Sequence, residues 1–319
     1  MKSSTSKIEP SLNTMKDRLV IGSRGSQLAL RQSRWVEEKL KRFYPDLTLS
    51  IEIIRTSGDV KTEPLSVIGG KGVFTKELED ALIDGRIDVA VHSLKDLPTI
   101  VPDRLVIAAI GEREDPRDAL VLKTGQNGSS ISDLSEGAVV GTSSQRRLAQ
   151  LRHRRRDVVG KDLRGNVDSR IRKLDEGQYD ALILAAAGLR RLGLDNRISG
   201  QIPIEEMLPA VGQGALAIET RADDVRTVEI VSGLDHEPTR NACVAERAFL
   251  RGLGGGCQLP IAGYASVSDG QISLEGLVGD REGKEIVRGK LTGAVTEAER
   301  LGAELATQLL SQGAARLLD

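Results

Sequence analysis

Hydrophobic and polar positions divide the chain into two kinds of segment that follow one another in turn. Short apolar runs, such as RLVIGS at 18–23 and IDVAVHS at 87–93, are typical of buried strands, because both faces of such a strand are covered. SQLALRQSRWVEEKLKRFY at 26–44 has apolar residues at the spacing of an amphipathic helix. Alternation of this kind predicts an α/β fold with largely parallel strands.

Two parts of this pattern occur twice. VIGSRGSQLAL at 20–30 resembles VVGTSSQRRLAQL at 139–151, and each is predicted to form a strand, a turn and a helix. KELEDALIDGRIDVAVHSL at 76–94 resembles RIRKLDEGQYDALILAAAGL at 170–189, where a helix ends at a glycine and an aspartate opens a strand. The duplication predicts two similar α/β domains that face each other.

The domain limits follow from changes in this pattern. REDPRDALV at 113–121 is dense in charge and contains Pro116, so we predict a hinge there. After LPAVGQGALAIE at 208–219 the chain changes to a helix, a glycine-rich turn, strands and a last helix, which predicts a smaller α+β domain. The predicted parts are a disordered tail at 1–17, a first α/β domain at 18–113 plus 215–232, a second α/β domain at 118–208, and the α+β domain at 237–319.

Composition narrows the classes of function. The formal net charge is −1 and aromatic residues make up 2%, which is few for a surface that stacks nucleic-acid bases. The histidines have no ligand spacing and the two cysteines no CxxC spacing, so we expect neither a metal site nor a disulfide framework. The polar N-terminal segment lacks the apolar run of a secretory signal, and no apolar stretch is long enough to cross a bilayer. We therefore expect a cytoplasmic protein without a membrane or nucleic-acid partner.

Arginines and hydroxyl groups gather in four segments that follow predicted strands: SRGS, HSLKD, GTSSQRR and LRGNVDSR. Ligand sites of open α/β sheets lie beyond the carboxyl ends of strands, where helix N-termini and arginine forks bind anions. A single arginine is more often a solvated surface group. In a chain with a net charge of −1, however, this local concentration favours a small polyanion in a cleft over nucleic acid. The candidates are Arg24, Ser26, Ser144, Arg146, Arg147, Arg164 and Arg170.

The run RHRRRD at 152–157 differs from these segments. It continues a helix and has no glycine turn, so we predict a solvated face.

Asp96 is the strongest candidate for a functional carboxylate. It follows a buried strand beside Lys95, where burial and arginine neighbours would tune its charge. A cap of the turn before Pro98 is the structural alternative. Lys95 is more readily an ion-pairing group than a Schiff-base amine.

Two glycine-rich stretches indicate a moving cover and a point of covalent attachment. The long polar segment at 54–74 places three glycines around Lys71, as in a lid over a cleft. Cys257 follows three consecutive glycines, and a free thiol on such a turn suits nucleophilic or covalent attachment chemistry. Cys243 lies in a helical pattern and is predicted to be a core residue.

Together these residues resemble the porphobilinogen deaminase family, also called hydroxymethylbilane synthases, from about Arg18 to the C-terminus. The resemblance rests on nine segments in order: IGSRGSQLAL, GGKGVFTKELEDAL, DVAVHSLKDLP, EREDPRDAL, VVGTSSQRR, LRGNVDSR, LAAAGLRRLGL, LPAVGQGA and GGGCQLPIAGYA. It implies a monomer of three domains. Two would be similar to those of periplasmic binding proteins, and the third would carry Cys257.

The resemblance also implies an activity. The family joins four porphobilinogen molecules head to tail, releases ammonia at each step, and frees linear hydroxymethylbilane with water. The chain of pyrroles grows on a dipyrromethane cofactor, whose thioether anchor would be Cys257. The acetate and propionate groups of the pyrroles are the polyanion expected above. Asp96 resembles the family's catalytic carboxylate, which stabilises the cation formed when ammonia leaves.

Other positions match the family's binding residues. By resemblance, the cofactor carboxylates would be held by Lys95, Ser144, Arg146 and Arg147, the substrate or growing chain by Arg24, Ser26, Arg164, Arg170 and Arg191, and the mobile loop would contain Lys71 and Phe74. Gln145 and Asp168 depart from the family pattern and bear on the local arginine geometry.

Two other functions compete with this one. A solute-binding protein of the same duplicated fold would grip a small dicarboxylate or oxyanion, but it leaves Cys257 without a task. A nucleic-acid-binding protein has support only from the run at 152–157 and is opposed by the low aromatic content. A dipyrromethane adduct in the intact mass would separate the three.

Overall fold

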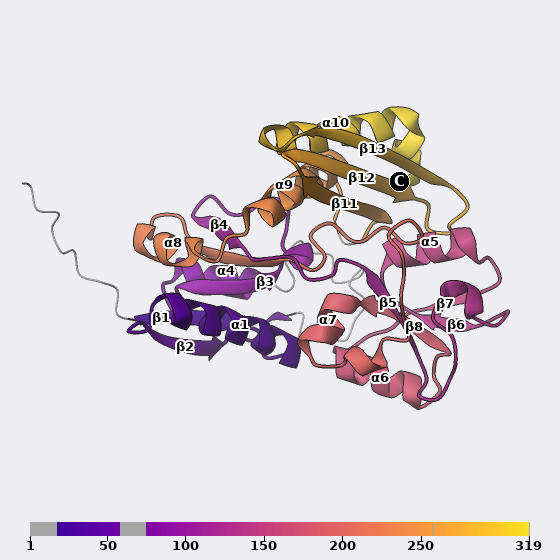
Figure 1. The fold of residues 1–319 in the computed structure, drawn as a ribbon, viewed down its shortest axis with the longest axis horizontal. Coiled ribbons are helices and arrows are strands. Elements are labelled where there is room, and N and C mark those ends of the chain that lie inside the picture. The colour runs from indigo at the N-terminus through magenta and orange to yellow at the C-terminus, as the bar shows by residue number, and fades with distance from the viewer. Residues whose placement is uncertain (1–17, 58–74, 257, 319) are drawn as a thin grey trace, which may run out of the picture.

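The computed structural model describes residues 18–57, 75–256 and 258–318 and folds them into three sheets with covering helices (Figure 1). The predicted tail at 1–17, the loop residues Lys71 and Phe74, and Cys257 all lie outside the described residues. Within the described ranges, no helix is both long enough and apolar enough to span a membrane.

The first domain is built on a five-stranded sheet with the order β2-β1-β3-β10-β4, in which only β10 runs against the other strands. Its core packs Leu19 and Ile21 of β1 against Val36 and Leu40 on the buried face of α1. The elements are β1 (Arg18–Ser23), α1 (Gln27–Phe43), β2 (Thr48–Ile53), α4 (Lys76–Ile83), β3 (Val89–Ser93), β4 (Leu105–Ile110), β10 (Leu216–Arg221) and α8 (Val225–Ser232).

The second domain repeats this arrangement with the order β7-β6-β8-β5-β9, and again one strand, β5, runs against the others. Its elements are β5 (Asp118–Leu122), β6 (Val139–Gly141), α5 (Gln145–Arg154), β7 (Val159–Lys161), α6 (Val167–Asp175), β8 (Ala181–Ala185), α7 (Ala186–Arg191) and β9 (Gly200–Gln201).

The two α/β domains match down to single hydrogen bonds. The backbone N–H of Val20 donates to the Asp88 carboxylate at 2.8 Å, and that of Val139 donates to Asp180 at 2.7 Å. Each aspartate thus ties the start of one strand, β3 or β8, to its parallel neighbour, β1 or β6. The predicted duplication and the largely parallel α/β fold are confirmed.

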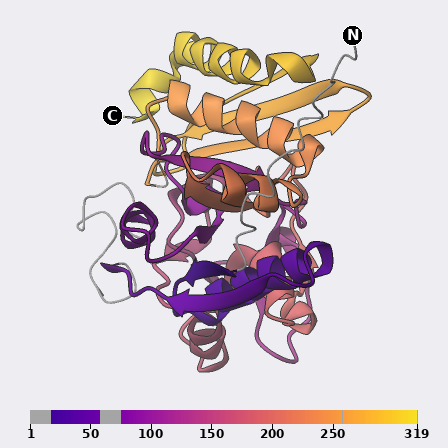
Figure 2. The ribbon, with the colours of Figure 1, turned by 90° about the vertical axis from the view of Figure 1, so that its left-hand side faces the viewer.

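The third domain is a smaller α+β unit, as predicted. Its antiparallel sheet has the order β11-β12-β13, and α9 and α10 pack on each other and on the sheet (Figures 1 and 2). Phe249 of α9 is fully buried, and Gly276 leaves room for its ring, because a Cβ there would lie 2.4 Å from it. Figure 2 shows α9 between α10 and the first domain. The elements are α9 (Glu237–Gly252), β11 (Ile261–Ser268), β12 (Gln271–Gly279), β13 (Ile286–Ala294), α10 (Ala298–Leu309) and α11 (Ala315–Leu318).

The predicted hinge at 113–121 is too long. Asp118–Leu122 forms β5, whose residues are all buried, so the connection from the first domain ends at Arg117. A buried strand resists bending because its backbone groups are held in the sheet. The exact domain limits stay predictions.

The run at 152–157 is largely exposed, as predicted, with His153, Arg154, Arg156 and Asp157 open to solvent, but Arg155 also makes contacts that the sequence pattern did not predict. Arg155 donates to the carbonyl oxygens of Ile131 and Leu134 at 2.8 Å each and pairs with Asp157. A guanidinium carries five donors in a fixed fork, so it satisfies loop carbonyls that a count of charges along the sequence does not reveal. The arginine therefore fastens a loop of the second domain.

Candidate active-site cleft

A cleft of about 1160 Å³ lies where the three domains meet. Pockets for drug-sized ligands measure about 300–1000 Å³, so this cleft is large for a small-molecule site. Every predicted site residue that the structure describes lines it: Arg24, Ser26, Lys95, Asp96, Ser144, Arg146, Arg147, Arg164, Arg170 and Arg191. Gly256 also lines it, which brings the immediate neighbour of Cys257 to the cleft. The individual roles of these residues stay predictions.

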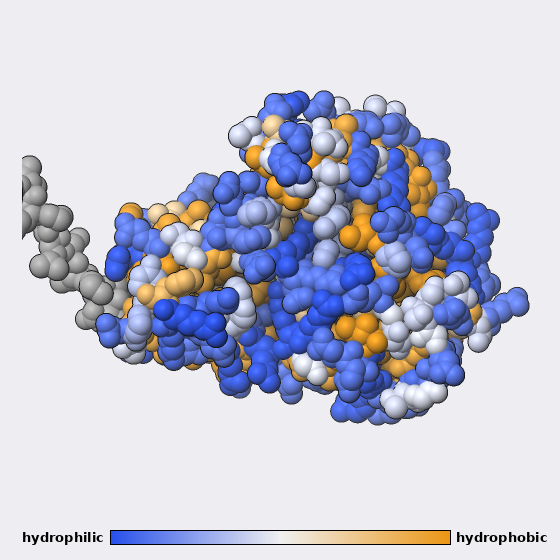
Figure 3. Space-filling view, viewed as in Figure 1, coloured by the Kyte–Doolittle hydropathy of each residue, from blue (hydrophilic) through white to orange (hydrophobic). Residues whose placement is uncertain are grey.

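The described lining carries ten basic side chains and two acidic ones. The acidic residues are Asp96 and Asp168, and the basic residues are Arg24, Arg55, Lys95, Arg146, Arg147, Arg164, Arg170, Arg172, Lys173 and Arg191. The whole chain has a formal net charge of −1, so the positive charge is concentrated in the cleft. A concave basic surface gathers anions. On the face shown in Figure 3, the surface where the domains meet is mainly hydrophilic.

Two serines mark the helix starts that open on the cleft. Ser26 is the N-cap of α1 and accepts from the backbone N–H of Ala29 at 3.2 Å. Ser144 is the N-cap of α5 but makes no side-chain cap hydrogen bond, whereas its neighbour Ser143 donates to the Leu163 carbonyl at 2.6 Å. Helix N-termini favour anions. The Ser144 hydroxyl lies at such an N-terminus and is not used for capping, so it can hydrogen-bond to an anion in the cleft.

Asp96 and Lys95 lie on a single 3₁₀ turn (Leu94–Asp96) directly after β3. Asp96 is exposed to solvent, and its carboxylate makes no hydrogen bond or ion pair with another described residue, so the alternative of a turn cap gains no support. Lys95 Nζ lies 3.4 Å from the Gln213 side-chain oxygen. Burial lowers the pKa of Lys95 to about 8, with Asp96 opposing the shift and Arg147 adding to it.

Asp118 is the buried counter-charge of the cleft. Its carboxylate is fully inaccessible and accepts from Arg146 at 2.8 Å, from Arg147 at 2.7 and 3.0 Å, and from Gln213 at 2.9 Å. Burial alone would raise the pKa of Asp118, but the two guanidinium groups outweigh burial and hold it well below its ordinary value. Asp118 therefore fixes the direction of both arginines.

A second buried carboxylate connects this cluster to the third domain. Glu246 of α9 pairs with Arg113 at 2.5 Å and accepts from the backbone N–H groups of Gly212 and Ala265. Arg113 also donates to the Gln213 carbonyl at 2.8 Å. The two chain connections between the α/β domains thus meet at α9.

The arginines at the rim are held by backbone oxygens. Arg170 donates to the Gly165 carbonyl at 2.8 Å, and Arg191 to the Gly214 carbonyl at 2.6 Å. Burial lowers the pKa of Arg170 and of Arg191 to about 10. Both guanidinium groups remain charged at neutral pH and retain further donors for a carboxylate.

Sequence patterns did not single out Asp118, Gln213 or Glu246. Asp118 fell within a stretch read as a hinge, and Glu246 is one of many charged residues in a helical pattern. Only Gln213 had a signal in the sequence, namely the glycines on either side of it. In the structure Gly212 and Gly214 adopt φ angles of 71° and 92°, a conformation that favours glycine.

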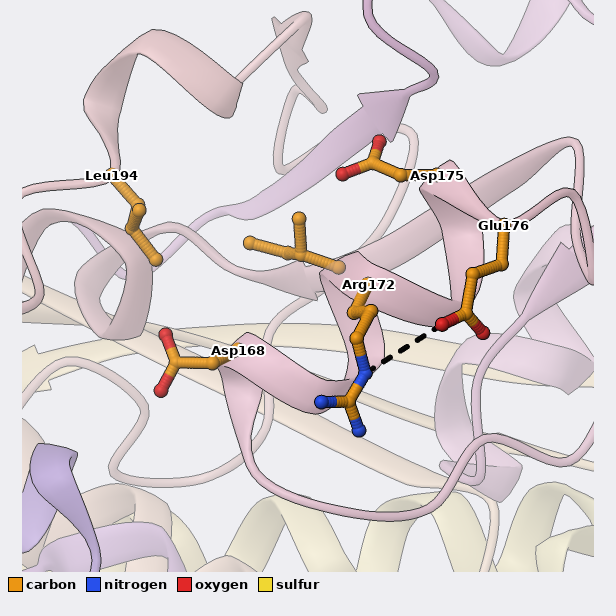
Figure 4. Close-up of a pocket in the computed structure, with 6 residues that line it drawn as sticks. Asp168, Arg172, Asp175, Glu176 and Leu194 are labelled. Atoms are coloured by element: carbon orange, nitrogen blue, oxygen red, sulfur yellow. Dashed lines mark ion pairs between the residues drawn. The ribbon is translucent and has the colours of Figure 1, made fainter.

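A smaller hollow, of about 460 Å³, lies on α6 and shares Asp168 and Arg172 with the lining of the cleft (Figure 4). Asp168, Asp175 and Glu176 make it acidic, and Arg172 faces Glu176 with 3.7 Å between the charged atoms. It would repel a polycarboxylate. Within the described residues, no group of three or more His, Cys, Asp or Glu side chains is placed to hold a metal ion.

The Asp118 cluster predicts a stability difference. Asp118→Ala should lower the free energy of unfolding by about 3–5 kcal/mol, because it leaves two buried guanidinium groups without a counter-charge. Asp162→Ala is the matched control, since Asp162 pairs with Arg164 at the exposed rim, where a pair contributes about 1 kcal/mol or less. Denaturant titration of both variants measures the difference, and equal losses would contradict the assignment.

Among solved structures, the chain is similar to a TRAP periplasmic solute binding protein from Desulfovibrio salexigens, with 11% identity, 69% of this chain and 72% of that chain covered, and a TM-score of 0.42. It is also similar to the periplasmic aliphatic sulphonate binding protein of Escherichia coli, with 16% identity, coverages of 74% and 70%, and a TM-score of 0.40. Because both TM-scores are below 0.5, the description of the fold rests on the three sheets alone.

Sequence relatives are much closer. The family model "Porphobilinogen deaminase, dipyromethane cofactor binding domain" matches residues 19–229, and "Porphobilinogen deaminase, C-terminal domain" matches residues 241–311. The porphobilinogen deaminase of Synechococcus elongatus is 51% identical over 300 residues, which are 94% of each chain. That of Gloeobacter violaceus is 48% identical over 308 residues, covering 96% of this chain and 94% of the relative. The chain belongs to the porphobilinogen deaminase family.

Proposed function

We propose that the basic cleft is where this chain carries out the reaction of its family, the condensation of four porphobilinogen molecules on a dipyrromethane cofactor to give hydroxymethylbilane. One observation carries the proposal: ten predicted site residues from both α/β domains converge on a single cleft that reaches Gly256, next to Cys257. A cleft with ten basic side chains matches a ligand in which every pyrrole bears two carboxylates.

The residues present fit the cofactor. Arg146 Nε is buried without a hydrogen-bond partner, and a buried donor left unpaired is costly. A cofactor carboxylate would satisfy it. Arg147, Ser144 and Lys95 complete a set of cationic and hydroxyl donors, and Cys257 would hold the cofactor by its thioether. When bound, the dipyrromethane supplies the pyrrole end from which the product chain grows.

Asp96 is the proposed catalytic residue. Its carboxylate lies at the cleft on the turn that follows β3 and makes no hydrogen bond or ion pair with another described residue. It can therefore accept from pyrrole N–H groups and place a negative charge beside the cation that develops on porphobilinogen as ammonia leaves. Charge fixed in advance stabilises the transition state more than the ground state.

The other basic residues are proposed to orient substrate. Arg24 and Ser26 come from the first domain, whereas Arg164, Arg170 and Arg191 come from the second. Carboxylates held from both sides would bring the reacting pyrroles into line. The roles proposed for Lys71 and Phe74 as part of a covering loop concern residues outside the described ranges.

The compartment and ligand class are inferred from composition and from the cleft, and the oligomeric state from the family resemblance. We infer a cytoplasmic monomer that binds porphobilinogen and no nucleic acid. The free, buried thiol of Cys243 fits a reducing compartment. The concentration of positive charge in one cleft, together with 2% aromatic residues, favours small anions over a polynucleotide.

The anchor is tested by mass. Cys257→Ser should give a folded protein without the covalent cofactor and almost without activity, because the thioether cannot form. Cys243→Ser should keep both, since Cys243 is fully buried in α9 and burial raises the pKa of its thiol to about 12. Intact masses of the denatured variants decide between them. An adduct retained by Cys257→Ser would refute the anchor, and a parent protein without any adduct would refute the proposed function.

Asp96→Asn tests the catalytic role. Asparagine caps turns and helices about as well as aspartate, so stability should be kept, while turnover should fall by about 10²-fold or more because the charge is lost. Single-turnover formation of enzyme-bound pyrrole intermediates measures the chemistry, and thermal unfolding serves as the control. Near-normal chemistry in a stable variant would remove Asp96 from the mechanism.

The low pKa of Lys95 predicts that anion binding depends on pH. Below pH 8 the ammonium group of Lys95 is charged. Above pH 8 Lys95 loses its proton when no anion is bound, so binding of a carboxylate requires the uptake of a proton. The affinity for the anion therefore falls as the pH rises. We expect the affinity of cofactor-free Cys257→Ser protein for citrate to fall by up to about tenfold per unit above pH 8. Adding Lys95→Arg, which stays charged, should flatten the profile. A flat profile with Lys95 in place would contradict a role in anion binding.

A further inference from the structure

The turn that carries Asp96 is held through its backbone. Leu94 N–H donates to the Ala215 carbonyl at 3.0 Å, and Leu97 N–H donates to the Leu94 carbonyl at 3.2 Å. The Asp96 carboxylate makes no hydrogen bond or ion pair with another described residue. The position of the carboxylate therefore depends on what holds the peptide groups on either side of it.

Arg247 holds the C-terminal side of this turn. Its guanidinium donates from Nη1 to the Leu97 carbonyl at 3.1 Å and from Nη2 to the Pro98 carbonyl at 2.6 Å. The residue is 8% exposed and forms no ion pair with a described carboxylate. A buried cation without a direct ion pair is costly, and the two carbonyl groups partly compensate for that cost.

The same helix leads toward the proposed cofactor anchor. Arg247 lies on α9 of the third domain, which ends at Gly252, shortly before Cys257. Its neighbour Glu246 binds Arg113 and the Gly212 backbone, so α9 is fastened firmly to the connections between the α/β domains. The guanidinium fork of Arg247 is thus a short, rigid link from the cofactor-bearing domain to the catalytic turn.

We propose that Arg247 is a positioning residue, which sets Asp96 relative to the segment that carries Cys257 by clamping the Leu97 and Pro98 carbonyls. The inference rests on the proposed function. It explains why a carboxylate without hydrogen bonds of its own can be aimed accurately, since displacement by about 1 Å costs about 10²-fold in rate.

The test compares Arg247→Gln and Arg247→Lys with Arg251→Gln in the full-length holoenzyme. Arg251 lies one turn further along α9, is 41% exposed in its side chain, and pairs with Glu299 at the surface. Both Arg247 variants should keep the cofactor adduct mass and the KM for porphobilinogen, while kcat falls about 10- to 100-fold, less for lysine than for glutamine. Amide hydrogen exchange should quicken at residues 94–99 and stay unchanged in α9. Arg251→Gln should match the parent in every measurement.

Two results would overturn the proposal. One is a kcat within twofold of the parent in both Arg247 variants. The other is a loss of activity that follows loss of the adduct or of thermal stability in both variants, which would make Arg247 a structural residue only. A parent enzyme without adduct would instead refute the proposed function itself, so the two failures are distinguishable.

Discussion

The cleft depends on the neutralisation of buried charge by Asp118 and Glu246. Both carboxylates are fully inaccessible, and a buried charge is tolerated only when it is paired and hydrogen-bonded. Asp118 meets this condition with Arg146, Arg147 and Gln213, and Glu246 meets it with Arg113 and backbone N–H groups. If one of these partners moved away, a charged group would remain buried in a medium of low dielectric constant without compensation. The need to pair these two buried carboxylates therefore fixes the orientation of Arg146 and Arg147. It also fixes the place where the interdomain connections meet α9.

Burial also prepares the cleft for anions. It lowers the pKa of Lys95, Arg170 and Arg191, which means that the folded chain holds these cations at a cost before any ligand arrives. A carboxylate bound there, as proposed, would relieve that cost with little rearrangement, because hydrogen bonds to Gly165 and Gly214 already orient two of the guanidinium groups. Donors arranged in advance bind a polycarboxylate with less loss of entropy than mobile surface side chains.

The duplicated architecture explains how such donors meet. In each α/β domain a strand, β1 or β6, leads into a helix whose N-cap residue is a serine, Ser26 in one and Ser144 in the other, and both turns open on the same cleft. The third domain has no counterpart in the duplication. It adds α9, through which Glu246 and Arg247 contact the connections and the turn beside Asp96.

The sequence by itself determined the α/β alternation, the duplication, the α+β third domain and the strand-end residues of the cleft, because these features are local in the chain. The roles of the residues came from the family resemblance. Only the tertiary structure decided that Asp118 is a buried counter-charge, that Arg155 fastens a loop and that Arg247 reaches the turn that carries Asp96. Each of these depends on partners distant in sequence, and local pattern carries no record of which distant charges and carbonyl groups the fold will bring together.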